Sequence, residues 1–142
     1  PDALEQVLKA SRGTVHSRGG RLACVFGCGG SRDVGKRPLM GEIASRLAQR
    51  VFITSDNPRD EDPELIIRQI QEGAGPDAIS ISDRRQAILA AIQEAGADDL
   101  ILIAGKGHET YQEVRGERHH FSDAEEATEA LKAWRKEQGV AQ

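Results

Sequence analysis

Residues 27–38 (GCGGSRDVGKRP) combine four glycines with three cations, Arg32, Lys36 and Arg37, a composition that favours binding of an anion. The spacing from Gly30 to Lys36 matches the nucleotide-binding pattern G-x-x-x-x-G-K, but Arg37 stands where that pattern needs a Ser or Thr hydroxyl for magnesium. The segment is therefore either a diverged phosphate cradle or a turn that binds another anion.

A second polar segment, SDNPR, groups Asp56, Asn57, Pro58 and Arg59 in one tight unit. Asp and Asn side chains can bond nearby backbone groups and proline fixes φ, so we expect the arginine to be held pointing outward. A guanidinium in such a position suits a carboxylate, through a bidentate pair that lysine cannot copy. Taken alone, the same residues are more often an ordinary turn.

A third segment, residues 105–109 (GKGHE), contains two glycines, Gly105 and Gly107, that let the backbone approach a ligand. Lys106 supplies a point charge, and Glu109 could accept hydrogen bonds from an ammonium group. His108 could be a general base, although a single loop histidine is more often a hydrogen-bonding strut. Together the three segments offer Arg for carboxylates and Asp or Glu for amines, which is the chemistry of an amino-acid pocket.

Each of these segments follows an apolar run that predicts a buried strand. The predicted strands are residues 22–26, 51–54, 78–81 and 100–104. Continuous apolar strands alternating with helices are typical of a parallel sheet covered by helices on both faces, so the predicted class is α/β and Rossmann-like. Ligands bind beyond the carboxyl ends of such strands, where the three polar segments lie.

Helical spacing of apolar residues predicts the covering elements. The predicted helices are residues 2–10, 39–47, 64–72, a helix capped by Asp83 that runs to residue 95, and a last helix capped by Ser122. Pro38 fits the first position of the second helix, and residues 13–20 read as a glycine-rich loop. Residues 111–114 and 118–121 predict a small hairpin near the C-terminus.

The composition limits the classes of partner. At 142 residues and 38% hydrophobic, the chain suits one domain with a full core. A net charge of -4 and an aromatic content of 4% disfavour nucleic acid as a partner. No apolar stretch approaches the roughly 20 residues of a membrane span and no signal-peptide pattern is present, so we expect a cytoplasmic protein without a membrane partner.

The two cysteines, Cys24 and Cys28, predict no metal site, because no other residues complete a zinc set at suitable spacing. We expect Cys24 to pack in its strand and Cys28 to be partly exposed on the turn, each with a structural role.

The segments GCGGSRDVGKRPLMGEIA, SDNPR and LIAGKGHETYQ, in this order and spacing, resemble the carboxy-terminal domain of the Mur ligases over nearly all of the chain. The resemblance implies that residues 1–142 are a single amino-acid-binding domain. Family members carry a uridine-nucleotide-binding domain and a central ATPase domain before it, so Pro1 would fall just after a linker. ATP and Mg2+ would be bound mainly by the central domain, and this fragment alone is expected to be inactive.

The resemblance also implies an amide-forming reaction of peptidoglycan synthesis. ATP would phosphorylate the D-glutamate carboxylate of a UDP-N-acetylmuramoyl-dipeptide, and the amine of the incoming amino acid would attack the acyl phosphate. SDNPR favours meso-diaminopimelate as that amino acid, with Arg59 on its far carboxylate and Glu109 on its far ammonium. The residues implied to hold it are Arg32, Asp56, Asn57, Pro58, Arg59, Gly105 and Glu109. No catalytic residue is implied in this domain.

Two departures and two alternatives stay open at this point. The family's turn reads GGDRDKGKRP, whereas this chain has Ser31 and Val34 in place of an Asp and a Lys, which leaves open what phosphate contact the turn makes. Lys36, Lys106 and His108 are further candidates for such a contact. The alternatives are a non-catalytic anion-binding module, and a sibling ligase that adds lysine or another amino acid; SDNPR speaks against the sibling.

Overall fold

A computed structural model of the chain describes residues 2–30, 33–105 and 109–138. Within these ranges, helices and strands alternate along most of the chain. In chain order they are α1 (Asp2–His16), β1 (Leu22–Phe26), α2 (Lys36–Leu47), β2 (Arg50–Ile53), α3 (Pro63–Gln71), β3 (Ile79–Ser80), α4 (Arg84–Gln93), β4 (Leu100–Ile103), β5 (Tyr111–Val114), β6 (Glu117–His120) and α5 (Asp123–Glu137).

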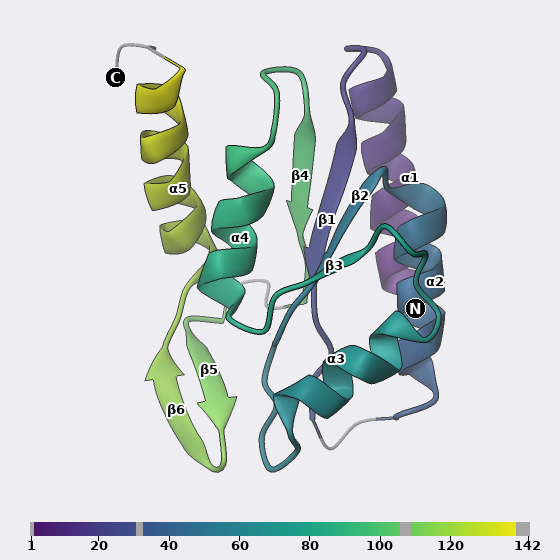
Figure 1. The fold of residues 1–142 in the computed structure, drawn as a ribbon, viewed down its shortest axis with the longest axis vertical. Coiled ribbons are helices and arrows are strands. Elements are labelled where there is room, and N and C mark those ends of the chain that lie inside the picture. Colours follow the sequence, from purple (N-terminus) through teal and green to yellow (C-terminus); the bar gives the residue numbers. More distant parts are fainter. Residues whose placement is uncertain (1, 31–32, 106–108, 139–142) are drawn as a thin grey trace.

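Strands β1 to β4 form one parallel sheet in the order β3-β2-β1-β4, and β5 and β6 form a separate antiparallel hairpin. The predicted class, a Rossmann-like parallel sheet with a small hairpin near the C-terminus, is confirmed. In Figure 1 the arrows of β1 and β4 point toward the end of the molecule that carries the hairpin and α3. The loops that follow β1, β2 and β4 therefore gather at that end.

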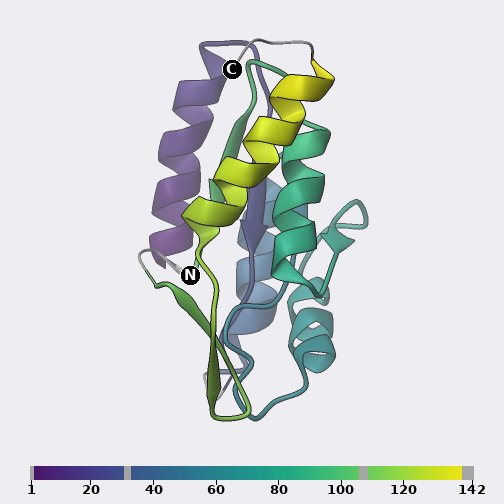
Figure 2. The same cartoon turned by 90° about the vertical axis from the view of Figure 1, so that its left-hand side faces the viewer.

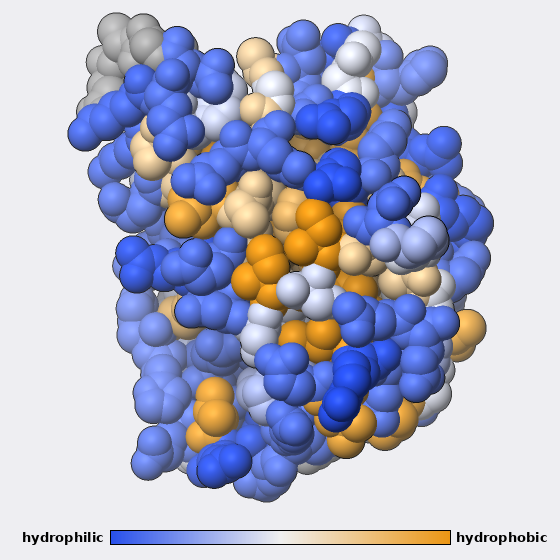
Figure 3. All heavy atoms as spheres, in the orientation of Figure 1, coloured by the Kyte–Doolittle hydropathy of each residue, from blue (hydrophilic) through white to orange (hydrophobic). Residues whose placement is uncertain are grey.

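Two apolar clusters lie on opposite faces of the sheet, because alternate side chains of a strand point to opposite faces. Cys24 and Phe26 of β1 pack with α1, α2 and α3, whereas Val25 of β1 packs with α4 and α5. Figure 2 shows α1 on one side of the sheet and α4 and α5 on the other. On the α4 side the outer surface is mostly hydrophilic, with apolar residues gathered near its centre (Figure 3).

The capping residues define where several helices begin. Asp83 accepts hydrogen bonds from the backbone N–H groups of Arg85 and Gln86, and Ser122 accepts one from Glu125, as the sequence predicts. The prediction that Pro38 occupies the first helical position is wrong, because α2 begins two residues earlier, at Lys36. A proline in the first turn is still tolerated, since N–H groups there have no intrahelical partner.

Two further predictions about elements are wrong. Helix α1 continues to His16, into the first half of the predicted loop, because Val15 is buried at 2% exposure and holds the last turn on the core. Strand β4 was expected to be buried on both faces, but all four of its residues are only half-buried. It is the edge of the sheet, because the chain leaves it for the separate hairpin.

Candidate functional site

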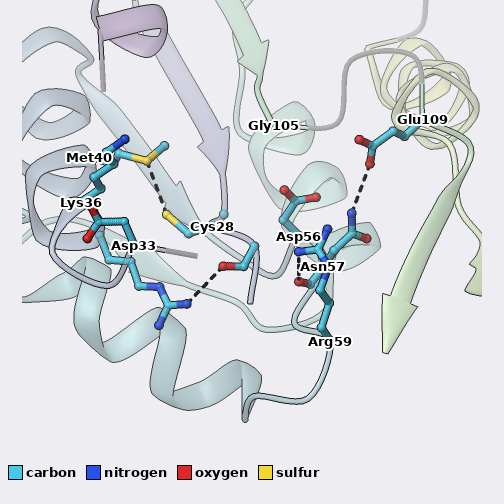
Figure 4. A pocket seen from close by; sticks show the side chains of 12 residues that line it. Cys28, Asp33, Lys36, Met40, Asp56, Asn57, Arg59, Gly105 and Glu109 are labelled. Carbon is cyan, nitrogen blue, oxygen red and sulfur yellow. Dashed lines mark hydrogen bonds between the residues drawn. The ribbon is translucent and has the colours of Figure 1, made fainter. Parts of the chain in front are cut away.

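A cavity of about 360 Å³ opens between the loops that follow β1, β2 and β4. Figure 4 shows Asp56, Asn57 and Arg59 on one side of it and Cys28, Lys36 and Met40 on the other. The residues that line the cavity are Gly27, Cys28, Gly29, Asp33, Lys36, Arg37, Met40, Asp56, Asn57, Arg59, Gly105 and Glu109.

Most of the predicted site residues meet at this cavity. Asp56, Asn57, Arg59, Gly105 and Glu109 all line it, although they come from two segments almost 50 residues apart in sequence. Gly105 has φ of +116°, and a Cβ there would lie 3.4 Å from Asp56 Oδ2, so the two loops touch. Their convergence follows from the sheet, in which β2 and β4 flank β1 on either side.

The remaining predicted residues either do not line the cavity or lie outside the described part of the chain. Pro58 does not line the cavity; its carbonyl accepts a hydrogen bond from the backbone N–H of Glu61, and the residue lines a different hollow. Arg32 lies outside the described residues, as do Lys106 and His108. Ligand contacts of all the residues predicted for the site stay predictions.

Asn57 is the polar centre of the site, with only 4% of its surface exposed. Its Nδ2 donates to Glu109 Oε1 at 3.1 Å, and its Oδ1 accepts from the backbone N–H of Glu113 at 2.8 Å. A buried amide with both ends bonded has one orientation, so Asn57 fixes the Glu109 carboxylate at the cavity wall.

Arg59 is held in an unusual backbone conformation, with φ of +53°. Its N–H donates to the carbonyl of Glu113 at 3.1 Å, and its carbonyl accepts from the N–H of Arg115 at 2.7 Å. A non-glycine residue in the left-handed region costs roughly 1 to 2 kcal/mol, so these two bonds to the hairpin are what keep it there. The side chain lies at the cavity wall, where Nη1 donates to the carbonyl of Gly30 at 2.9 Å.

The hairpin is therefore a part of the site that the sequence did not reveal. Besides these backbone bonds, Gln112 Nε2 donates to the carbonyl of Asp56 at 2.7 Å, and Glu113 Oε2 lies 3.8 Å from Arg59 Nε. The hairpin was predicted as an element, but no local pattern indicated that it would pack against SDNPR.

Arg37 has a different role from the one its position in the turn suggested. It is 1% exposed, and its guanidinium bonds Glu61 through Nη1 at 3.1 Å and Nη2 at 2.8 Å. It also donates to Gln69 Oε1 at 2.6 Å and to the carbonyl of Gly29 at 3.1 Å. Its charge is thus neutralised by Glu61, so that of the two described cations of the turn that line the cavity, Lys36 is the one outside this ion pair.

The glycines of the turn serve close packing between loops. The N–H of Gly30 donates to the carbonyl of Asn57 at 2.7 Å, and a Cβ on Gly30 would collide with the carbonyl of Pro58. A Cβ on Gly27 would likewise collide with the carbonyl of Thr54. Glycine is required here because the backbones touch, which accounts for these two glycines without a phosphate.

Cys28 forms part of the opposite wall, buried at 9% exposure rather than partly exposed as expected. Its Sγ lies 3.5 Å from Met40 Sδ, and burial raises the pKa of the thiol to about 11. Cys24 is fully buried, and burial raises its thiol pKa to about 12. Both thiols are therefore protonated near neutral pH, in keeping with packing roles.

Metal and membrane features were also sought in the described part of the chain. Among those residues, no three His, Cys, Asp or Glu side chains group as ligands for a metal ion. None of the described helices is long and apolar enough to cross a membrane.

Residues 1–107 match the family described as Mur ligase, glutamate ligase domain. The chain belongs to this family. Similar curated proteins are named UDP-N-acetylmuramoyl-L-alanyl-D-glutamate--2,6-diaminopimelate ligase. The one from Pseudomonas putida is 56% identical over 136 residues, covering 94% of this chain and 27% of the relative. The one from Acidovorax sp. is 57% identical over 133 residues, covering 92% and 26%.

A solved structure of a ligase with the same name superposes with a TM-score of 0.86 at 49% identity, covering 94% of this chain and 27% of that one. The chain thus spans about a quarter of the length of the relatives it matches.

Proposed function

We propose that this chain is the amino-acid-binding domain of an ATP-dependent ligase that adds meso-diaminopimelate to UDP-N-acetylmuramoyl-L-alanyl-D-glutamate. The observation that carries the proposal is the meeting of Arg59, Asn57 and Glu109 at one cavity. The names of the relatives support the same substrates. In this proposal residues 1–142 are the carboxy-terminal domain of a longer cytoplasmic enzyme.

The substrate has two amino-acid ends, and the cavity offers chemistry for the end that does not react. Arg59 would pair with the far carboxylate, and Glu109, oriented by Asn57, would accept from the far ammonium. Lysine has no second carboxylate, so it would leave Arg59 without its ligand partner. Such a loss corresponds to discrimination of about tenfold to a hundredfold.

The domain would contribute binding and orientation to the reaction. ATP, with Mg2+, would supply the phosphoryl group that activates the D-glutamyl carboxylate as an acyl phosphate. Because Arg37 is committed to Glu61 and the Gly30 N–H to Asn57, the turn offers a poor phosphate cradle, and we assign ATP and Mg2+ mainly to the rest of the ligase. Closure of this domain over the site would exclude water from the acyl phosphate.

The test is the rate of the full-length ligase with meso-diaminopimelate and with lysine. We expect kcat/KM to favour meso-diaminopimelate, and Arg59→Asn, which tolerates the left-handed backbone, to remove about tenfold to a hundredfold of that preference. Arg46→Ala is the control, because Arg46 is exposed on α2 and pairs with Glu5 and Glu42. Equal use of the two amino acids, or an unchanged preference in Arg59→Asn, would defeat the proposal.

A further inference from the structure

Arg84 is a buried cation outside the cavity that contacts both loops of the amino-acid site. Its residue exposure is 1%. Nη1 donates to the carbonyl of Ser55 and Nη2 to the carbonyl of Ala104, each at 3.0 Å. Ser55 immediately precedes Asp56, and Ala104 immediately precedes Gly105, so both carbonyls lie one residue before the cavity.

The position of Arg84 is electrostatically unfavourable without its partners. It is the first residue of α4, where the helix dipole disfavours a positive charge. Burying a guanidinium also costs free energy unless the charge is paired and hydrogen-bonded. Asp123 provides the pair, with Oδ1 accepting from Nε and Oδ2 from Nη2, both at 2.8 Å. The planar fork of the guanidinium is thereby fixed in orientation.

The contacts of Arg84 span a gap that the sheet itself does not bridge. Strands β2 and β4 are not neighbours, because β1 lies between them. Arg84 reaches across the end of β1 and bonds the carboxyl end of each flanking strand. Two residues earlier, the backbone carbonyl of Ser82 accepts hydrogen bonds from the hydroxyls of Thr54 and Ser55. These bonds hold the start of α4 against the residues that follow β2.

We infer that Arg84 and Asp123 are positioning residues for the amino-acid site. Their ion pair fixes the distance between the loop that carries Asn57 and Arg59 and the loop that carries Gly105 and Glu109. That distance sets the separation of the cation and the carboxylate that would read the far end of the substrate. The inference rests on the proposed function, because it assigns Arg84 to selection of that amino acid.

The neighbouring residue supplies a matched control. Arg85 pairs with Glu126 through Nε and Oε2 at 3.1 Å, and so joins the same two helices, α4 and α5. Its side chain is 68% exposed, and this ion pair involves neither of the two loop carbonyls. If the Arg84–Asp123 pair only joined the two helices, the Arg85–Glu126 pair would share that role. The proposed spacing of the loops instead depends on the bonds from Arg84 to the loop carbonyls.

The experiment compares Arg84→Lys, Asp123→Asn and Arg85→Lys in the full-length ligase. A lysine ammonium keeps the charge but cannot bond Asp123 and both carbonyls in the same fork geometry. We expect Arg84→Lys to raise the KM for meso-diaminopimelate by about tenfold or more, since displacements near 1 Å are costly. The KM values for ATP and for the nucleotide should stay within about twofold. Asp123→Asn should shift the same KM in the same direction, and Arg85→Lys should shift none.

Several outcomes would overturn the inference. An unchanged KM for meso-diaminopimelate in Arg84→Lys, or a parallel change for all three substrates, excludes selective positioning. If Arg84→Lys does not fold, Asp123→Asn decides by the same criteria, and failure of both to fold shows a role in the fold alone. Equal use of lysine by the unaltered enzyme would instead defeat the proposed function, so the two failures are distinguishable.

Discussion

Two arginines that line the cavity show how burial decides what a charge can do. Arg37 is 1% exposed and its guanidinium is bonded to Glu61, Gln69 and Gly29. The Arg59 side chain is 26% exposed and lies at the cavity. The first arginine stabilises the loops, and the second remains accessible to a ligand.

Glu61→Gln tests this assignment of Arg37. The substitution leaves the buried guanidinium without its countercharge, so we expect the free energy of unfolding to fall by about 3 kcal/mol. Urea denaturation of the chain measures it. Arg59→Asn is the comparison and should lower stability by less, because the Arg59 ion pair with Glu113 is long at 3.8 Å and partly exposed. Equal losses in the two variants would contradict the assignment.

The Cys28 thiol gives a prediction for pH dependence. Because burial raises its pKa to about 11, the folded state prefers the protonated thiol over the ordinary value of 9.0. The resulting stabilisation is complete below pH 9 and is lost as the pH rises toward 11. Alkylation of Cys28 by iodoacetamide should be slow at pH 8 and rise about tenfold per pH unit up to near pH 11. Mass spectrometry follows the reaction, with Cys28→Ser reporting any labelling of Cys24. A rate that levels off near pH 8 would refute the raised pKa.

At the scale of elements, the site depends on packing between the turn, the SDNPR loop and the hairpin. The turn contributes Gly30, whose N–H bonds Asn57, and the hairpin contributes Gln112 and Glu113, which bond Asp56 and Asn57. The SDNPR loop is thus held from two sides. Its conformation, including the left-handed Arg59, is a property of these contacts and not of the loop alone.

Two glycine-to-alanine substitutions should therefore have opposite effects. Gly30→Ala forces the turn away from the Pro58 carbonyl, so we expect a lower Tm and, in the full-length ligase, weaker binding of meso-diaminopimelate. Gly13 is an exposed residue of helix α1 with nothing near its Cβ, so Gly13→Ala should stabilise the chain by about 0.5 to 1 kcal/mol. Differential scanning calorimetry measures both. An unchanged Tm for Gly30→Ala would show that the loops do not need the close approach.

At the scale of the whole molecule, the two apolar clusters pack on the two faces of the sheet. The cavity lies beyond the carboxyl ends of the strands. Trp134 ties the last helix to the residues just after α4, since its Nε1 donates to the carbonyl of Ala95 at 2.9 Å. The last helix is therefore part of the packed core.

We expect the 142-residue chain to fold cooperatively by itself and to form no amide bond. Its two clusters lie on both faces of one sheet, which supports independent folding. In the proposed function, ATP is bound mainly by the other domains of the ligase. Calorimetry should give one unfolding transition, and an assay for ADP release with all substrates should give no signal, with the full-length ligase as the positive control. ADP release by the chain alone would place the ATP site within it.

Much of the fold could be predicted because it depends on local residue types. The apolar runs of β1 and β2 and the caps Asp83 and Ser122 are short-range patterns, and the structure confirms them with shifts of a residue or so at the strand ends. Where burial by distant residues intervened, local patterns failed. Val15 extends α1 into a predicted loop, and Leu39, the first apolar residue of the helix predicted over residues 39–47, is 55% exposed.

The sequence by itself determined the three polar segments, their order after three parallel strands, and the resemblance to a ligase family. Only the tertiary structure decided which of their residues serve a ligand. Arg37 meets Glu61 across 24 residues, Asn57 meets Glu113 across 56, and Arg84 meets Asp123 across 39. The physical reason is that the availability of a charged side chain depends on its burial and its partners, and these are set by contacts between segments distant in the chain.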